Sequence, residues 1–379
     1  MIPGTNGLVR RGLLASVPIA LMACSGDPDS DRSSTAGPDD KVLNVYNWTD
    51  YIGKNTIADF EARTGIKVTY DTYDSNEVLE TKLLTGRSGY DVVFPTTTIV
   101  GRMAKVGVFL RLDKARLPNL SNLDPEAMRQ LAANDPGNEH AIAYTWGTTG
   151  LGYNPAMVKK ALGTDVIDSW SAVFDPATAS KLAKCGITML DAPEDVFESA
   201  EIYLGNDPGN EDLGELAAAE ELLLRVRPYV RAFDTTQHLS ALASGEICVS
   251  LSWSGLMHQA RTRGASAAQP VQVVYVIPRE GAPLYFDTVA IPADAPHPDN
   301  AHAFLDFLME PRVIADITNE IGYANANTAS LPLVDAAFRD DPSVYPSREL
   351  REKLHVSRAR SPEYSRELNR AWTRIKTGQ

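Results

Sequence analysis

Cysteine and histidine are both scarce in this sequence, and their spacing argues against the common metal sites. Only three cysteines and six histidines occur among 379 residues. No CxxC pair is present, which argues against a thioredoxin-like motif or a zinc ribbon. No two histidines stand four residues apart and no HExxH occurs, which argues against a zinc hydrolase. His297 and His302 flank a proline-containing turn, a pattern typical of a surface loop. We therefore expect no metal site.

Other catalytic signatures are missing as well. The sequence has no GxSxG nucleophile elbow and no GxxxxGK[ST] phosphate loop. The glycine cluster GTTGLG at 147–152 stands alone, and we interpret it as a crossing strand or hinge. Without a cofactor fingerprint or a nucleophile–base pair, we expect no cofactor and no enzymatic reaction.

Basic residues are outnumbered, because 36 lysines and arginines face 49 aspartates and glutamates, for a net charge of −13. Such an acidic chain is poorly suited to phosphate backbones, so we expect no nucleic-acid partner. A cationic partner is favoured instead. The chain is long enough for two lobes, and its 44% hydrophobic content is sufficient for packed cores.

The N-terminal residues predict export. Arg10 and Arg11 precede GLLASVPIALMA, an apolar run of signal-peptide length that is too short to span a bilayer. The run ends in LMAC, which resembles the lipobox of bacterial lipoproteins, although Met22 is unusual there. We predict that residues 1–24 are a lipoprotein signal peptide and that Cys24 carries the lipid. Ordinary secretion, with Cys24 present by chance, is the alternative. Residues 25–40 are predicted to be a flexible polar tether.

Two cysteines remain if Cys24 is lipidated, namely Cys185 and Cys248. An even pair in an oxidising compartment favours one disulfide. Two separate buried thiols are the alternative, because a free cysteine often packs as a small hydrophobic side chain.

Strands and helices alternate after the tether. The expected strands are 41–48, 66–73 and 90–95, and the expected helices are 55–65, 75–86 and 96–109. Asn55 and Thr98 are expected helix caps, and Gly65 and Gly86 expected helix ends. This rhythm predicts a mostly parallel sheet with helices on both faces. Ligands bind beyond the carboxyl ends of such strands, where Trp48–Tyr51, Asp74, Ser75 and Thr96–Thr98 are expected.

A second alternating region follows residues 143–155, which we expect to cross between two lobes. Strands are expected at 184–190 and 246–253, and a long extended stretch at 271–292 is expected to carry the chain back to the first lobe. The tail from Asn300 has a helical pattern.

Aromatic residues and acids coincide at several expected strand ends. The clusters are Trp48 with Asp50 and Tyr51; Asp191 with Glu194 and Asp195; Tyr285 with Phe286 and Asp287; and the single residues Trp253 and Tyr323. An aromatic face attracts an organic ammonium ion, and a carboxylate gives it charge-assisted hydrogen bonds. Core packing of the rings and helix capping by the acids are the alternatives at each cluster.

The sequence resembles the periplasmic polyamine-binding proteins of ABC transporters, over about residues 42–379. The segments that carry the resemblance are YNWTDYI, TGIKVTYDTYDSNEVLETKL, YDVVFP, WGTTGLGYN, LDAPEDVF, GEICVSLSW, FDTVAIPADA, YANAN and AWTRIKTG. The resemblance implies an α/β, two-lobe periplasmic-binding-protein fold of type II, in which each lobe is a mixed, mostly parallel sheet flanked by helices. The expected lobes are residues 41–145 with 278–325, and 146–277 with 326–379, with the ligand cleft between them.

The resemblance also implies a set of ligand-binding residues. These are Trp48, Asp50, Tyr51, Thr96, Thr98, Asp195, Trp253, Tyr285, Asp287 and Tyr323. It further implies a disulfide between Cys185 and Cys248. One position departs from the pattern, because Leu256 stands where close putrescine-binding relatives have an acid. Leu256 is therefore expected to alter specificity.

The implied function is a periplasmic receptor that captures putrescine, spermidine or a related cationic amine for an ABC importer. Its expected partners are the polyamine and an inner-membrane permease, with the membrane reached only through the lipid on Cys24 and the protein itself a monomer. Two alternatives remain: a polyamine-sensing lipoprotein, and a receptor for a different amine because of Leu256. A ferric-ion receptor would need paired tyrosines, whereas the adjacent aromatic pair here is Tyr285–Phe286.

Overall fold

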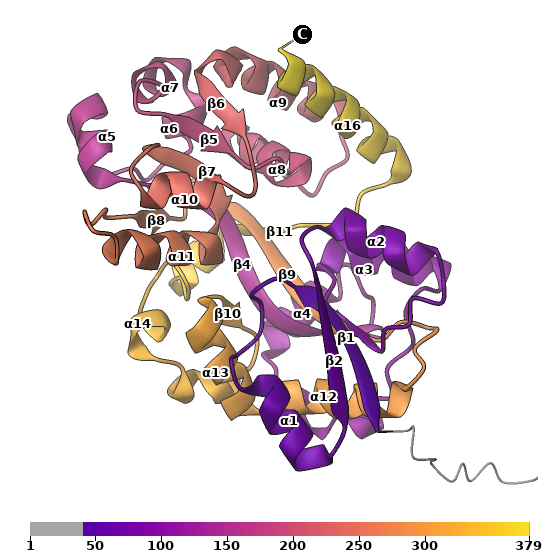
Figure 1. Ribbon diagram of the computed structural model, residues 1–379. Coiled ribbons are helices and arrows are strands. Elements are labelled where there is room, and N and C mark those ends of the chain that lie inside the picture. The colour runs from indigo at the N-terminus through magenta and orange to yellow at the C-terminus, as the bar shows by residue number, and fades with distance from the viewer. Residues whose placement is uncertain (1–40, 379) are drawn as a thin grey trace, which may run out of the picture. The chain divides into compact units, whose positions relative to one another are not determined.

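A computed structural model describes residues 41–378, whose strands form one mixed, twisted sheet (Figure 1). The strands are β1 Val42–Trp48, β2 Lys67–Tyr73, β3 Val92–Val93, β4 Ala141–Tyr153, β5 Ile187–Met189, β6 Val230–Phe233, β7 Val249–Trp253, β8 Val274–Val276, β9 Ala282–Ala290, β10 Ala324–Asn325 and β11 Leu354–Val356. The main strand order in this part of the chain is β2-β1-β3-β9-β4-β7-β5-β6.

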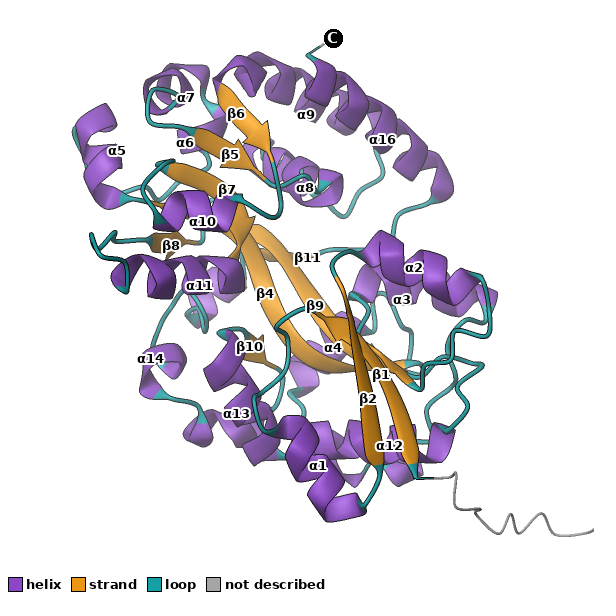
Figure 2. Ribbon diagram, viewed as in Figure 1, coloured by secondary structure: helices purple, strands orange, loops and turns teal. Residues whose placement is uncertain are grey.

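Helices flank this sheet along most of its length (Figure 2). They are α1 Thr56–Thr64, α2 Asn76–Leu84, α3 Thr97–Met103, α4 Pro125–Leu131, α5 Pro155–Leu162, α6 Ser171–Phe174, α7 Pro176–Leu182, α8 Pro193–Leu204, α9 Leu213–Val226, α10 His238–Ala243, α11 Ser254–Ala265, α12 Pro298–Leu308, α13 Pro311–Ile321, α14 Ala336–Arg339, α15 Arg348–Arg351 and α16 Pro362–Thr377. No helix within residues 41–378 has the length and apolar character needed to cross a membrane.

Strand direction differs between the outer and the central parts of the sheet. At one end β1 pairs in parallel with β2 and β3, and at the other end β5 pairs in parallel with β6 and β7. The centre is antiparallel, because β4 pairs with β9 through its first half and with β7 and β8 through its second half. The single strand β4 therefore belongs to both parts of the sheet.

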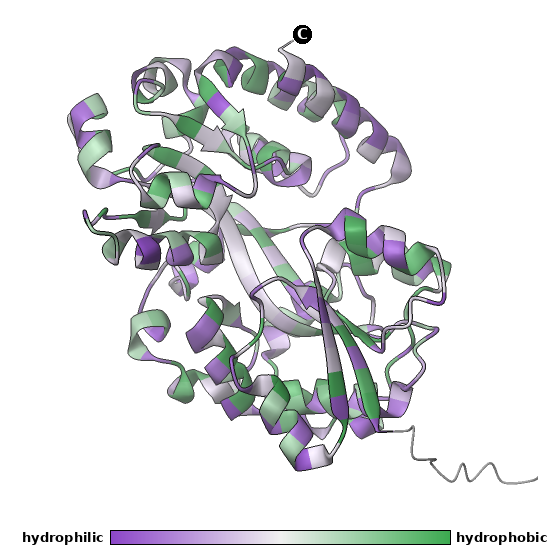
Figure 3. Cartoon of the chain, in the orientation of Figure 1, coloured by the Kyte–Doolittle hydropathy of each residue, from purple (hydrophilic) through white to green (hydrophobic). Residues whose placement is uncertain are grey.

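The long strand β4 is the predicted crossing segment. It is pale in Figure 3, because glycine, threonine and alanine of intermediate hydropathy make up most of it. Its glycines serve close packing: a Cβ on Gly147 would lie 2.4 Å from the Tyr285 hydroxyl, and one on Gly152 would lie 2.0 Å from the Met257 sulfur. The GTTGLG cluster is thus a strand against which large side chains pack.

Two large hydrophobic clusters lie on either side of this crossing. One joins β1, α1 and α12 through side chains such as Leu43, Phe60 and Phe304. The other joins β5, β7 and the C-terminal helix α16, with Trp170 and Trp372 among its members. The last helix therefore packs against the part of the chain that contains residues 151–277.

Several local expectations need correction. Asn55 precedes α1, but its backbone is helical and its side chain caps nothing. Thr98 lies inside α3, whose N-terminal flanking residue is Thr96. The third strand is only Val92–Val93, and the extended stretch at 271–292 is interrupted between β8 and β9. By contrast, Gly65 ends α1 with a left-handed φ of 72°, as expected.

The two cysteines of the described chain form a disulfide. Cys185 follows α7, Cys248 precedes β7, and their Cα atoms lie 5.5 Å apart. The disulfide interpretation is therefore confirmed over that of two separate thiols. Cys24 and the predicted signal peptide and tether lie outside the described residues.

Candidate functional site

A cavity of about 340 Å³ lies where the carboxyl ends of β1, β2 and β7 meet the N-terminus of α8 and the strand β9. Its lining residues are Trp48, Thr49, Asp50, Tyr51, Tyr73, Asp74, Asn76, Thr96, Thr97, Thr98, Glu194, Asp195, Glu198, Thr235, Thr236, Trp253, Leu256, Gln259, Tyr285, Asp287, Tyr323 and Ser357. All ten predicted ligand-binding residues and Leu256 are brought together here. Their contact with a ligand stays a prediction.

Asp287 is a buried acid of the cavity, with no basic side chain paired to it in the described part of the chain. It is 6% exposed, and one of its carboxylate oxygens accepts a 2.6 Å hydrogen bond from the Tyr51 hydroxyl. The Tyr51 hydroxyl also lies 2.8 Å from that of Thr145, which holds it in place. Burial raises the pKa of Asp287 to about 7, with the charge of Asp195 adding to the rise and the Tyr51 hydrogen bond opposing it.

Alternation along β9 determines which side chains reach the cavity. Tyr285 and Asp287 line it, whereas Phe286 between them packs on the opposite face with Leu284 and Leu131. Of the three residues predicted as one cluster, Tyr285 and Asp287 therefore face the cavity and Phe286 does not.

Aromatic rings pack edge to face around Asp287. The rings of Tyr51 and Tyr323 have centroids 5.2 Å apart at an angle of 71°. A Cβ on Gly255, at the start of α11, would lie 2.1 Å from the ring of Tyr323. Glycine at this position therefore lets α11 approach the ring and close that side of the cavity.

The two indoles of the cavity are each fixed by the hydrogen bond of their N–H. Trp48 donates to the Phe94 carbonyl at 2.8 Å, and its ring packs on Tyr73 with centroids 4.6 Å apart. Trp253 donates to the Asp195 carboxylate at 2.9 Å. Fixed rings lose little side-chain entropy when an apolar group binds against them.

Asp195 is held by neutral donors only. Its Oδ1 accepts from Trp253 and, at 2.5 Å, from the Thr149 hydroxyl. Burial raises the pKa of Asp195, and these two hydrogen bonds oppose the rise. The carboxylate is thus positioned at the N-terminus of α8 without a cation of its own.

The charges that line the cavity all have one sign. Its carboxylates are Asp50, Asp74, Glu194, Asp195, Glu198 and Asp287, and no lysine, arginine or histidine is among the lining residues. Asp50 and Asp74 are exposed, and Asp50 adopts a left-handed φ of 54°, a conformation that aspartate tolerates better than most residues. The arrangement is suited to a positively charged ligand.

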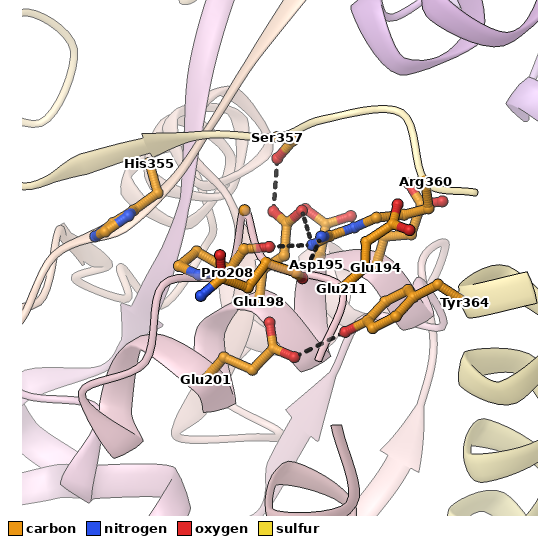
Figure 4. A network of polar contacts seen from close by, with 12 residues as sticks. Glu194, Asp195, Glu198, Glu201, Pro208, Glu211, His355, Ser357, Arg360 and Tyr364 are labelled. Atoms are coloured by element: carbon orange, nitrogen blue, oxygen red, sulfur yellow. Dashed lines mark hydrogen bonds and ion pairs between the residues drawn. The ribbon is translucent and has the colours of Figure 1, made fainter. Parts of the chain in front are cut away.

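The acids on α8 were only partly anticipated from the sequence. Glu194 was recognised in the LDAPED cluster, whereas Glu198 and Ser357 were missed. Glu198 accepts a 2.6 Å hydrogen bond from Ser357 and pairs with Arg360 at 3.2 Å, as the close-up in Figure 4 shows. Its position four residues after Glu194 places both on one face of α8, which was a usable signal. Nothing in the sequence indicated Ser357.

Asp191, in the same cluster, turns away from the cavity. Its carboxylate accepts hydrogen bonds from Lys376 at 2.7 Å and from the Trp372 indole at 3.1 Å. Both donors are on α16, so Asp191 holds this helix against the hydrophobic cluster that contains Trp170 and Trp372. Within residues 41–378 no three histidine, cysteine or acidic side chains are grouped as they would be to hold a metal ion.

Comparison with known proteins decides the family. The sequence profile of the bacterial extracellular solute-binding proteins matches residues 55–346. The chain belongs to this family. Together with the relatives and solved structures that follow, this match confirms the resemblance to periplasmic polyamine-binding proteins.

This solute-binding protein has curated relatives at high identity. It is 48% identical over 342 residues to the putrescine-binding periplasmic protein of Pseudomonas aeruginosa, covering 90% of this chain and 93% of the relative. It is 43% identical over 376 residues to the putrescine-binding periplasmic protein of Escherichia coli, covering 99% of this chain and 100% of the relative.

Solved structures agree with the fold. The spermidine/putrescine ABC transporter substrate-binding protein of Streptococcus pneumoniae aligns with a TM-score of 0.78 at 25% identity, covering 89% of this chain and 99% of the other. A spermidine/putrescine transporter protein of Listeria monocytogenes aligns at 0.77 with 30% identity, covering 89% of this chain and all of the other. The predicted class, an α/β periplasmic-binding-protein fold, is confirmed for this solute-binding protein.

Proposed function

We propose that this solute-binding protein captures a cationic polyamine and delivers it to an ABC importer in the inner membrane. One observation carries the proposal: the cavity combines fixed aromatic rings with six carboxylates and has no basic side chain among its lining residues. The named ligands of the relatives, putrescine for several and spermidine with putrescine for others, support the same class of ligand.

The physical chemistry of the cavity is suited to an alkylamine. Each methylene that the rings of Trp48, Trp253 and Tyr323 remove from water contributes about 0.8 kcal/mol. An ammonium over an indole face gains about 0.5 to 2 kcal/mol, depending on its desolvation. Asp287 and Asp195 are fixed acceptors for charge-assisted hydrogen bonds. No bond is made or broken, so the protein acts as a receptor.

The cavity draws its residues from both predicted lobes, residues 41–145 with 278–325 and residues 146–277 with 326–379. Trp48 and Asp287 come from the first predicted lobe, whereas Asp195 and Trp253 come from the second. We propose that the lobes close around the amine, because a ligand that contacts both favours the closed state. The receptor acts as a monomer in the periplasm, attached to the membrane by a lipid on Cys24.

Uptake experiments test transport directly. Deleting the gene is expected to reduce uptake of labelled putrescine or spermidine by the source bacterium, and restoring the wild-type gene should recover it. An Asp287→Asn gene should not. A sensory lipoprotein would leave uptake unchanged while altering the expression of target genes, and that result would contradict the transport function.

The affinity for the amine is expected to depend on pH. In the empty cavity the pKa of Asp287 is raised to about 7, mainly by burial. A bound ammonium favours the ionised carboxylate, so binding releases a proton below that pH and becomes weaker as the pH falls. For one such group the affinity for putrescine should drop about tenfold between about pH 8 and pH 6. Calorimetric titrations across this range measure it, and a flat profile would contradict the assignment of Asp287.

A further inference from the structure

The interior carboxylates of the cavity differ in the partners they already have. Glu198 is compensated: Arg360 pairs with it at 3.2 Å, Ser357 donates at 2.6 Å, and the Glu198 and Arg360 side chains are only 5% and 3% exposed. Arg360 itself donates to the carbonyl group of Pro208 (Figure 4). It also donates to the carbonyl group of Asn210. Glu198 therefore lines the cavity, but its charge is already paired with Arg360.

Three interior carboxylates lack a cation of this kind. Asp287 has only the Tyr51 hydroxyl, and Asp195 has only a threonine hydroxyl and an indole N–H. Glu194 forms one ion pair within residues 41–378, with the guanidinium of Arg102 at 3.7 Å, and Arg102 lies nearer to Glu80, at 3.2 Å. The charge of Arg360 also acts on Glu194, but the two are not in contact as an ion pair.

Glu194 remains available to a ligand. Its side chain is 35% exposed and lines the cavity at the first turn of α8, next to Asp195. The pKa of Glu194 is raised, first by burial, with Arg102 and Arg360 opposing the rise and Asp195 and Glu77 adding to it. The pKa of Asp287 is raised mainly by burial, and the charge of Asp195 adds to the rise. The three acids thus form a connected series that cations would stabilise.

The opposite wall supplies no further charge. Leu256 on α11 lines the cavity where the sequence resemblance places an acid in putrescine-binding relatives. Gln259, one turn later, is neutral. The interior carboxylates other than Asp287 are therefore all on α8, namely Glu194, Asp195 and Glu198.

Resting on the proposed function, we infer that the preferred ligand is a triamine and that Glu194 is the specificity-determining carboxylate that binds its third ammonium group. Asp287, Asp195 and Glu194 then each receive one cation. A diamine leaves one interior carboxylate uncompensated, although the relatives of highest identity described above are named for the diamine putrescine.

Calorimetry with spermidine and putrescine tests this inference. The wild-type protein is expected to bind spermidine at least about tenfold more tightly than putrescine, the effect of one charge-assisted hydrogen bond. Glu194→Gln should weaken spermidine binding about tenfold or more while changing putrescine binding by less than about threefold. Glu194→Ala, which lacks the amide, should show the same split between the two ligands.

Two control variants separate ligand binding from a purely structural role. If Glu194 served only to hold Arg102, Arg102→Gln would reproduce the effect of Glu194→Gln, and both amines would weaken in parallel. Glu80→Gln removes the other partner of Arg102 outside the cavity and should leave the ratio of the two affinities unchanged. A parallel loss of both amines in Glu194→Gln, or no loss, would overturn the inference.

The length of the ligand is controlled with octamethylenediamine, in which a methylene replaces the central amine of spermidine. It should bind more weakly than spermidine, and equal affinity would show that length decides, against the inference. Failure of every amine to bind would instead contradict the proposed function itself.

Discussion

Replacing Asp287 by asparagine is expected to reduce amine affinity by two to three orders of magnitude. The change keeps the shape of the side chain and an acceptor for the Tyr51 hydroxyl, but removes the negative charge from an enclosed position. A bound ammonium would then be buried without its counter-ion. Breaking such a pair costs about 3 to 5 kcal/mol, which corresponds to a loss of roughly a hundredfold or more in affinity.

The same substitution should not destabilise the empty protein. Burial raises the folded-state pKa of Asp287 to about 7 from its ordinary 3.8, so the folded chain binds more protons than the unfolded chain between these values. Stability therefore falls as the pH rises through this range, and asparagine removes that loss. At about pH 8 the melting temperature of Asp287→Asn should equal or exceed that of the wild type.

A matched control is Asp165→Asn, which changes an exposed acid that pairs only with Lys159. It should leave amine affinity unaltered. If Asp287→Asn bound the amine as tightly as the wild-type protein does, the Asp287 carboxylate would not contact the ligand. The proposed orientation of the amine would then be wrong.

Replacing Trp48 by alanine is expected to be the next most damaging change. The indole lines the cavity, and truncation removes both apolar contact area and the ring face that attracts an ammonium. Aromatic residues at the centre of a binding site typically cost about 2 to 4 kcal/mol when truncated, or roughly 30-fold to several-hundred-fold in affinity. Calorimetry or intrinsic fluorescence titration measures this loss.

Trp48→Phe separates the contribution of the ring from that of its hydrogen bond. Phenylalanine retains an aromatic face but cannot donate to the Phe94 carbonyl. Its affinity should lie between those of the wild type and Trp48→Ala. Should alanine bind the amine as well as tryptophan does, the aromatic wall would not contribute, and the account of the alkyl chain would fail.

The sequence was most informative where local pattern and topology act together. Trp48 ends β1 and Tyr51 follows it, the hydrophobic pattern of this strand is clear in the sequence, and parallel strands bring their carboxyl ends to one edge of the sheet. The alternation of β9 could equally have shown that Phe286 faces away from Tyr285 and Asp287. The family resemblance then connected these local clusters into one cavity.

Contacts between segments far apart in the chain could not be predicted from the sequence. Ser357 reaches Glu198 across 159 positions, and no local pattern indicates that β11 delivers it to α8. The helix caps failed for a related reason. Asn55 does precede the first residue of α1, but its helical backbone leaves its side chain without a capping hydrogen bond. The tertiary fold sets where α3 begins, and α3 starts before Thr98.

The position of Leu256 illustrates a third limit. The family resemblance implied that Leu256 stands where putrescine-binding relatives have an acid, but not which other acids line the same cavity. The structure places Glu194 and Glu198 on α8 within the same cavity.

Isothermal titration calorimetry of the purified protein with putrescine, cadaverine, agmatine and spermidine shows whether the cavity binds an alkylamine. We expect saturable binding of at least one of them, at one site per chain, with a Kd of about a micromolar or lower. The absence of measurable binding for all four amines, at concentrations up to about a millimolar, would contradict the proposed function.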